Sequence, residues 1–474
     1  MGMLNTLKLL LVSGLLVSGG LLIGSWLDPG EISMADIGIN SSTSMMNYSL
    51  TDVKSQNIKT AAHEVDIKLL NAGLNASFSK LNSKNTRVNA DHLDHLFEEI
   101  ELNGEAVGII HIYCEYPDYK WVGDDDEGIA CVDDASRAAV FYLRNYTYTG
   151  NQASLRKAKL LLNFLINMQA ENGYFYNFIW PDHSIHTEGV TTKAEPNWWS
   201  WRTLWTYGEA IEALDQNDEL VLRIKKSREK LLKVMLNDMS DSEKIDIEDG
   251  IEVSTWLPAR VAADQASVMM IGLAAVYRET GDSIIGNYLR RLAEGVMIAQ
   301  VKDTTSFADR AFLSWNNLWH AYGNSQAYAL QLVGRALSNE EMLVSASLEG
   351  DRFYESLLTK GGLSHFKVRK TDAGIEVYEE AKFQQIAYNY RPMIWACLES
   401  WKQNGQQLYL DRAIEIASWY TGSNPAGQIM YDSETGRTFD GIVSETEVNR
   451  NSGAESTIEA LLALQELNRY TSER

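Results

Sequence analysis

The sequence predicts an all-α protein, an (α/α)6 toroid of six helical hairpins with long loops on one face. Three observations support this prediction. Tryptophan-rich segments recur along the chain, helical segments come in pairs joined by turns of a few residues, and the links between successive pairs are much longer than those turns. Repetition of supersecondary units indicates a repeat architecture, and short turns make consecutive helices antiparallel neighbours.

The recurring segment is clearest at residues 195–208, with the sequence EPNWWSWRTLWTYG. Trp201, Trp205 and Gly208 fall there at i, i+4 and i+7, which is one face of a helix. Residues 315–323 repeat the outline, and residues 390–395 repeat it more loosely. We therefore expect each copy to open an inner helix of the ring.

Composition narrows the function classes. The chain has 474 residues, 45% of them hydrophobic, with 13 tryptophans and a formal net charge of −22. Nucleic-acid binding needs a basic surface to neutralise phosphates, so no nucleic-acid partner is expected. Tryptophans either fill a core or stack on the apolar face of sugar rings.

The first residues resemble a targeting segment. Lys8 precedes an apolar run from 9 to 23, and a turn-forming Asp-Pro-Gly follows it. We interpret residues 1–25 as a signal peptide, 26–50 as a flexible leader, and 51–474 as the toroid catalytic domain. This predicts a secreted or extracytoplasmic monomer without stable membrane insertion after cleavage. An uncleaved anchor is the alternative.

The elements follow in order. A helix at 51–81 is expected to lie on the outside of the ring, and the apolar, β-branched residues 106–116 predict an extended segment. The expected inner helices begin at Asp133, Trp198, Ala262, Trp315, Gln384 and Ala454. The expected outer helices lie at 155–169, 219–236, 284–300, 340–358 and 408–420.

The links between hairpins are the most informative feature. They span 170–197, 237–261, 301–314, 359–383 and 421–453, and the helices alternate in direction, so all should emerge on one face. Long loops in a compact domain are usually functional. The same face carries the N-termini of the inner helices, whose free N–H groups and positive dipole ends point to the centre of the ring.

Four segments carry a resemblance to a known superfamily: residues 131–138 (CVDDASRA), 168–175 (MQAENGYF), 198–208, and 449–455 (NRNSGAE). In these segments the chain resembles the six-hairpin glycosidase superfamily over about 106–467. Family 9 glycoside hydrolases are similar in layout, with an acidic base early and a catalytic glutamate before the last inner helix. Asp133, Asp134 and Glu455 stand in similar positions. The Asp-Ala-Gly-Asp-Tyr signature of family 9 is absent.

Glycoside hydrolysis needs one protonated and one ionised carboxyl group. The catalytic candidates are Asp133, Asp134, Glu195 and Glu455. Asp133 or Asp134 would activate water, and Glu455 or Glu195 would protonate the leaving oxygen. For Asp133, Asp134 and Glu455 the simpler explanation is structural, since acidic residues are favoured at helix N-termini. Glu195 precedes the tryptophan cluster, where desolvation would raise its pKa.

The substrate-binding candidates are polar or aromatic residues on the loop face. An internal ion pair is the simpler explanation for Arg137, and core packing is the alternative for the arginines and rings of the later helices. The full set is Asp124, Asp125, Arg137, Trp198, Trp199, Trp201, Arg202, Asp264, Trp315, Asn316, Tyr390, Arg391, Asn449 and Asn451.

The sequence therefore predicts an exported carbohydrate-active enzyme, a glycoside hydrolase acting on a poly- or oligosaccharide. Alternatives are a polysaccharide lyase or uronate epimerase, which needs a Tyr, His or Lys base and an Arg for the carboxylate, or a non-catalytic glycan-binding protein. No histidine spacing typical of a metal site is present, and no metal or cofactor is expected. The three cysteines indicate core packing or a single Cys114–Cys131 disulfide.

Overall fold

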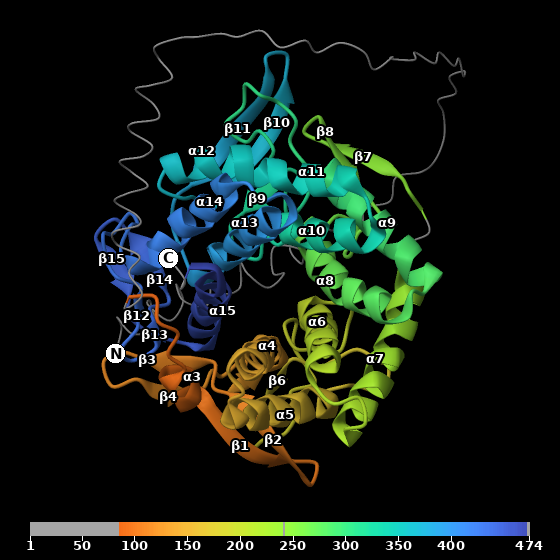
Figure 1. The fold of residues 1–474 in the computed structure, drawn as a ribbon, viewed down its shortest axis with the longest axis vertical. Coiled ribbons are helices and arrows are strands. Elements are labelled where there is room, and N and C mark those ends of the chain that lie inside the picture. Colours follow the sequence, from red (N-terminus) through yellow and green to blue (C-terminus); the bar gives the residue numbers. More distant parts are fainter. Residues whose placement is uncertain (1–84, 240–241, 472–474) are drawn as a thin grey trace. The chain divides into compact units, whose positions relative to one another are not determined.

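The computed structural model describes residues 85–239 and 242–471, which form a closed ring of helical hairpins (Figure 1). Each inner helix packs against the next, and the last packs against the first. The predicted (α/α)6 toroid is confirmed. Residues 1–25, 26–50 and the expected helix at 51–81 lie outside the described residues. The inner helices are α4 (Val132–Thr149), α6 (Trp198–Ala213), α8 (Ala263–Thr280), α10 (Gln326–Leu337), α13 (Arg391–Asn404) and α15 (Ala454–Thr471).

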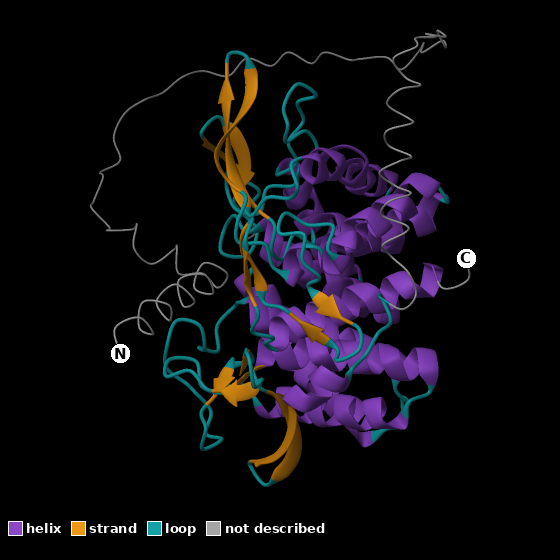
Figure 2. Ribbon diagram, turned by 90° about the vertical axis from the view of Figure 1, so that its left-hand side faces the viewer, coloured by secondary structure: helices purple, strands orange, loops and turns teal. Residues whose placement is uncertain are grey.

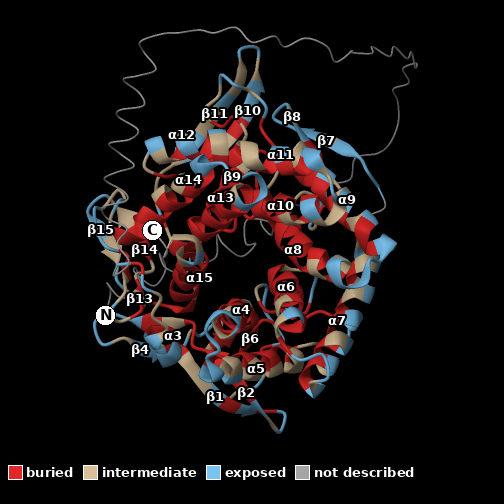
Figure 3. Ribbon diagram, viewed as in Figure 1, coloured by how far each residue is buried: buried red, intermediate tan, exposed pale blue. Residues whose placement is uncertain are grey.

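The outer helices are amphipathic and cover the inner ring. Buried residues occupy nearly the whole length of the inner helices, whereas the outer helices expose one face (Figure 3). A helix that is buried all round needs apolar or paired polar residues on every side. The outer elements are α5 (Gln152–Asn167), α7 (Glu219–Asp238), α9 (Ser283–Ile298), α11 (Glu340–Leu348) with η1 (Glu349–Phe353) and α12 (Tyr354–Thr359), and α14 (Gln407–Ala417) with η3 (Ser418–Thr421).

Local turn chemistry explains the hairpins. Gly150 and Gly281 end α4 and α8 in the left-handed conformation, at φ 72° and 65°. This is the conformation that lets a glycine close a helix. The next residues, Asn151 and Asp282, accept hydrogen bonds from the first N–H groups of α5 and α9. Such caps start a new helix at once, so each pair returns antiparallel.

The links between hairpins carry short antiparallel strands, which lie along one side of the helices (Figure 2). The expected extended segment at 106–116 is present as β2 and β3. A short helix, α3 (Asp91–Leu96), packs on α15. The strands are β1 (Phe97–Leu102), β2 (Glu105–Ile110), β3 (Tyr113–Glu115), β4 (Lys120–Val122), β5 (Ala130–Cys131), β6 (Phe178–Ile179), β7 (Ile245–Glu248), β8 (Ile251–Ser254), β9 (Leu318–His320), β10 (His365–Thr371), β11 (Gly374–Ala381), β12 (Tyr431–Asp432), β13 (Arg437–Thr438), β14 (Gly441–Ser444) and β15 (Glu447–Asn449).

Two expected helix starts are wrong. Trp315 lies in a turn before β9, and α10 begins only at Gln326. The reason is a distant partner, because β9 pairs with β10 and the Trp319 ring stacks on Phe366 at 4.9 Å. The fifth inner helix, expected from Gln384, begins at Arg391 after the short 3-10 turn η2 (Ala387–Asn389).

Candidate active site

The first turns of α4 and α15 meet at Arg137. This buried guanidinium donates hydrogen bonds to Asp134 at 2.6 Å, to Glu455 at 3.1 Å and to Glu459 at 3.0 Å. Asp134 precedes Arg137 by three residues and therefore shares its helical face. Glu455 and Glu459 share a face of α15 for the same reason. One cation thus joins three carboxyl groups from the first and last inner helices.

Arg202 and Arg391 extend this cluster onto α6 and α13. Arg202 forms an ion pair with Asp133 at 2.5 Å, and Arg391 forms one with Glu459. Arg202 also donates a hydrogen bond to the Tyr388 hydroxyl at 3.0 Å.

The Tyr388 ring lies beside three guanidiniums, those of Arg137, Arg202 and Arg391, at 5.2, 5.6 and 5.4 Å from its centroid. Cations are attracted to the face of an aromatic ring, so the tyrosine and the arginines stabilise each other's position. We name the whole cluster the N-terminal layer, because its helical members lie in the N-terminal halves of inner helices. It comprises Asp133, Asp134, Arg137, Arg202, Tyr388, Arg391, Glu455 and Glu459.

Two carboxyl groups in the N-terminal layer have a raised pKa. Burial raises the pKa of Glu455 above its usual 4.5, against the opposing charge of Arg137. Burial likewise raises the pKa of Asp134. The side chains differ in access, since that of Glu455 is 32% exposed and that of Asp134 only 4%. Glu455 is therefore the more accessible of the two carboxyl groups, whereas Asp134 is enclosed against Arg137.

Asp264 and His320 form a second polar group at the border of this layer. The His320 Nε2 atom lies 2.9 Å from Asp264 Oδ2, and Nδ1 lies 2.8 Å from the carbonyl oxygen of Tyr322. A carbonyl oxygen only accepts, which assigns a hydrogen to Nδ1. The Nε2 atom faces the Asp264 carboxylate, so both ring nitrogens of His320 have a polar partner.

Tyr322 covers this pair. Its ring stacks on His320 with centroids 3.8 Å apart. Burial, followed by the nearby Asp264, Tyr388 and Glu455, raises the pKa of its hydroxyl. Because these neighbours belong to both groups, the half-buried Tyr322 connects the His320–Asp264 pair with the N-terminal layer.

Several predicted residues lie outside the layer. The Glu195 side chain is exposed, and its backbone carbonyl oxygen accepts a hydrogen bond from the Ser200 hydroxyl. Its expected desolvation by the tryptophans is wrong, because those rings point into the core. Asp124 accepts hydrogen bonds from the backbone N–H groups of Asp126 and Glu127, which shapes a turn, and Asp125 is exposed.

The expected sugar platforms are mostly core residues. Trp199 donates to the Phe175 carbonyl oxygen and Trp201 to Gln265, and both rings are buried. Tyr390 is buried against Trp419 with centroids 4.5 Å apart. A ring covered on both faces cannot stack on a sugar, so these three assignments are corrected to packing.

The remaining predicted residues fall into three groups. Trp198 contacts the layer, since the Arg202 guanidinium lies 5.1 Å from its ring, although it is almost buried. Asn449 and Asn451 shape the loop before α15: Asn449 accepts a hydrogen bond from the Asn451 N–H, and Asn451 accepts one from the Tyr116 N–H. The turn that replaced the expected fourth helix start holds two half-buried residues, Trp315 and Asn316.

Sequence reasoning missed Tyr388, Glu459, His320 and Tyr322. Glu459 had a local signal, because it follows Glu455 by one helical turn in an apolar segment, where a charged residue needs a partner. Tyr388 lies in the short 3-10 turn η2 and Tyr322 in a turn, and no periodicity indicates the direction of either side chain. Their place depends on segments far apart in sequence, such as the Tyr388–Arg202 contact across 186 residues.

Other features bear on the expected cofactors and disulfide. Within 85–239 and 242–471, no group of three or more His, Cys, Asp or Glu side chains is arranged to hold a metal ion. Cys114, Cys131 and Cys397 are free and buried, so the disulfide is not formed and the packing interpretation holds. No helix in the described part of the chain is long and apolar enough to cross a membrane.

Comparison with known proteins was informative only for structure. The chain matches no protein-family model and no curated protein sequence. It is similar in structure to the cellobiose 2-epimerase of Spirochaeta thermophila, with 11% identity and a TM-score of 0.56 over 86% of this chain and 98% of that one.

A family 76 glycoside hydrolase from a bovine Bacteroides thetaiotaomicron strain has 10% identity and a TM-score of 0.54, over 82% of this chain and 79% of that one. A D-mannose isomerase has 11% identity and a TM-score of 0.53, over 85% and 97%. At such identities the likeness concerns the fold. The chain shares its (α/α)6 toroid fold with these structures.

Proposed function

We propose that this protein is a carbohydrate-active enzyme and, more specifically, a glycoside hydrolase whose reaction takes place at the N-terminal layer. The proposal rests on one observation. Glu455 is a partly exposed carboxyl group with a raised pKa, and it shares an arginine network with the second partly exposed carboxylate, Asp133. A glycosidase needs such a pair, one member protonated and the other ionised.

In this mechanism Glu455 donates its proton to the leaving glycosidic oxygen. Asp133, paired with Arg202, activates the water that attacks the sugar. Arg137 holds Glu455 in place, and burial favours the protonated form of its carboxyl group. Since Glu455 must be protonated to act, activity should fall as pH rises through its raised pKa.

Incubation with a panel of polysaccharides tests the proposal, with products analysed by mass and anomeric form. New reducing ends that are lost in Glu455→Gln and Asp133→Asn but kept in the exposed control Glu171→Gln would support it. Intact glycan after long incubation, together with measurable binding, would indicate a glycan-binding protein instead.

A specific observation favours a second candidate, a polysaccharide lyase or an epimerase. The side chain of Tyr388 carries a hydroxyl group and lies beside three arginines. A base next to cations suits removal of a proton alpha to a carboxylate or carbonyl group, because the cations stabilise the charge that develops. Unsaturated product absorbance, or solvent deuterium in a product of unchanged connectivity, would select this reaction. Both signals should then vanish in Tyr388→Phe.

A further inference from the structure

A cavity of about 670 Å³ lies on the opposite side of the ring from the N-terminal layer. Its lining comes from all six inner helices and mostly from their C-terminal halves. The spacing follows from the helices themselves. Arg137 and Arg144, Arg202 and Glu209, and Glu459 and Glu466 are each seven residues apart, two turns along one face and about 10 Å in rise.

An aromatic group separates the two charged regions. Trp205 and Trp395 meet edge to face with centroids 5.9 Å apart, and Tyr328 lies 5.1 Å from Trp395. Arg391 of the N-terminal layer and Arg144 of the cavity both lie over the Trp395 ring, at 4.6 and 4.4 Å. The three rings are buried at the border of the cavity, which we call the chamber.

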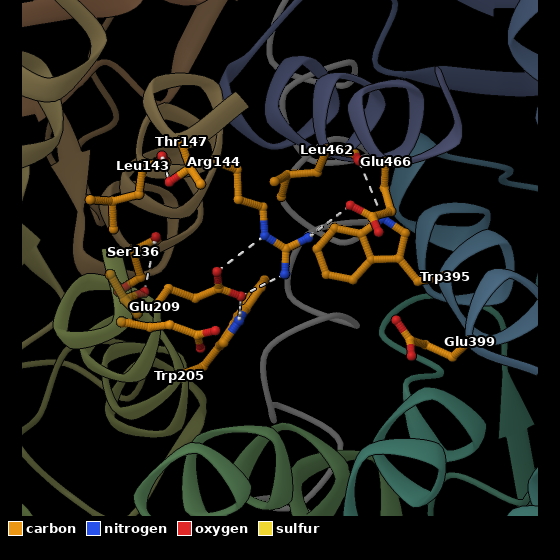
Figure 4. Close-up of polar contacts among 12 residues, drawn as sticks. Ser136, Leu143, Arg144, Thr147, Trp205, Glu209, Trp395, Glu399, Leu462 and Glu466 are labelled. Carbon is orange, nitrogen blue, oxygen red and sulfur yellow. Dashed lines mark hydrogen bonds and ion pairs between the residues drawn. The ribbon is translucent and has the colours of Figure 1, made fainter. Parts of the chain in front are cut away.

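The inner wall of the chamber carries fixed charges. Arg144 binds Glu209 through two hydrogen bonds and lies 3.8 Å from Glu466 (Figure 4). Lys402 bridges Glu399 and Glu466, at 2.8 and 2.9 Å. Burial opposes the ionisation of Glu466, but Arg144 and Lys402 outweigh it and lower its pKa to about 2. Glu466, Arg144 and Lys402 therefore stay charged and oriented at neutral pH.

The chamber is more basic than the chain. Its lining has five Lys or Arg side chains and four Glu side chains, whereas the whole chain has 42 basic and 64 acidic residues. Arg278, Arg335 and Arg469 are the outer cations, with side chains 46%, 34% and 40% exposed. The partner of Arg278 is Glu212, at 3.5 Å and itself 76% exposed. Such a loosely held guanidinium can turn to an incoming anion.

We propose that this chamber binds an acidic saccharide, a hexuronate or a short oligosaccharide that ends in one. The carboxylate would bind the outer arginines, which match its planar, bidentate geometry. The fixed glutamates and Lys402 would bind the hydroxyl groups of the sugar. The volume suits this class of ligand, since small-molecule pockets measure about 300–1,000 Å³.

Isothermal titration calorimetry of the full chain tests this proposal and measures binding, so it does not depend on catalysis. The probes are glucuronate, neutral glucose and inorganic sulfate. We expect glucuronate to bind at least about tenfold more tightly than either of the others, because both its carboxylate and its hydroxyl groups contribute to binding. Equal binding of sulfate and glucuronate would mean an anion site without sugar recognition, and would overturn the proposal. Absence of glucuronate binding, or equal binding of glucose, would also overturn it.

Variants locate the site. Arg278→Ala and Arg335→Ala should each weaken glucuronate binding by about tenfold, whereas Arg352→Ala, an exposed arginine outside the chamber, should leave it unchanged. Ala336→Trp fills the chamber without removing a charge and should abolish binding; circular dichroism checks that each variant is folded. Binding that survives all three chamber variants but is lost in Arg202→Ala belongs to the N-terminal layer, and then the chamber proposal fails.

Discussion

The N-terminal layer and the chamber use the same kinds of residue with opposite results. In both, an arginine of α4 pairs with glutamates of the neighbouring helix α15. In the N-terminal layer Arg137 is shared by three carboxyl groups, and burial raises the pKa of Glu455 and of Asp134. In the chamber three cations surround Glu466 and lower its pKa to about 2. The number of cations per carboxylate decides whether a buried acid can give up a proton or stays a fixed charge.

Replacing the acid of the N-terminal layer should have the largest effect. Glu455→Gln keeps the shape of the side chain and removes the proton donor, so kcat on a cleaved polysaccharide should fall about a thousandfold. Glu466→Gln, its counterpart in the chamber, should change kcat by less than about threefold. An aryl glycoside with a good leaving group needs no proton donor and should recover much of the lost rate in Glu455→Gln. Equal losses in the two variants would end the distinction between the regions.

Replacing Glu466 of the chamber should lower stability, although it should leave kcat nearly unchanged. Glu466→Gln leaves Arg144, Lys402 and Arg469 with one carboxylate fewer, and the free energy of unfolding should drop by about 3 kcal/mol. Glu212→Gln, an exposed glutamate in the same chamber, should cost less than about 0.5 kcal/mol. Urea unfolding at neutral pH measures both.

The acid dependence of stability sharpens this test. The folded pKa of Glu466, about 2, lies below its usual 4.5. The unfolded chain therefore binds more protons between these values, so the stabilisation by Glu466 is present above about pH 4.5 and is lost as pH falls towards 2. Glu466→Gln should flatten this part of the curve.

A third buried carboxyl group lacks a cation among its hydrogen-bond partners. Glu349, in η1, accepts hydrogen bonds from the Phe312 N–H at 2.9 Å and the Tyr354 hydroxyl at 2.8 Å, and burial raises its pKa to about 8. Here the folded state binds the extra proton, so stability should fall as pH rises from about 4.5 to 8. We expect a loss of about 2 kcal/mol between about pH 5.5 and 7, at 1.4 kcal/mol per pH unit for one proton. Thermal unfolding of Glu349→Gln should lack this dependence; an unchanged slope would assign it to other groups.

The smallest effect is expected at Glu195. Its exposed side chain lies outside both charged regions, so Glu195→Gln should alter kcat/KM by less than about twofold. A loss comparable to that of Glu455→Gln would move the acid to the loop before α6 and make the N-terminal layer a structural network.

The sequence by itself determined the helical hairpins. The apolar patterns with a period of 3.6 residues are local signals, and so are the Gly-Asn turn at 150–151 and the Gly-Asp turn at 281–282. Hydrogen bonds between residues close in sequence are enough to form these helix ends. The same locality identified the acids Asp133, Asp134 and Glu455, because each lies within a turn of a helix start. Glu459 could have been found in the same way.

Only the tertiary structure decided which pattern prevailed at residues 315–323 and which side chains meet. The Trp315 segment has the outline of a helix start, yet pairing of β9 with β10 outweighs that local preference. Trp199 and Trp201 became core residues because neighbouring elements cover them. The Arg391–Glu459 and Arg202–Tyr388 contacts join elements far apart in the chain. The electrostatic environment that raises the pKa of Glu455 and lowers that of Glu466 exists only once the ring is closed.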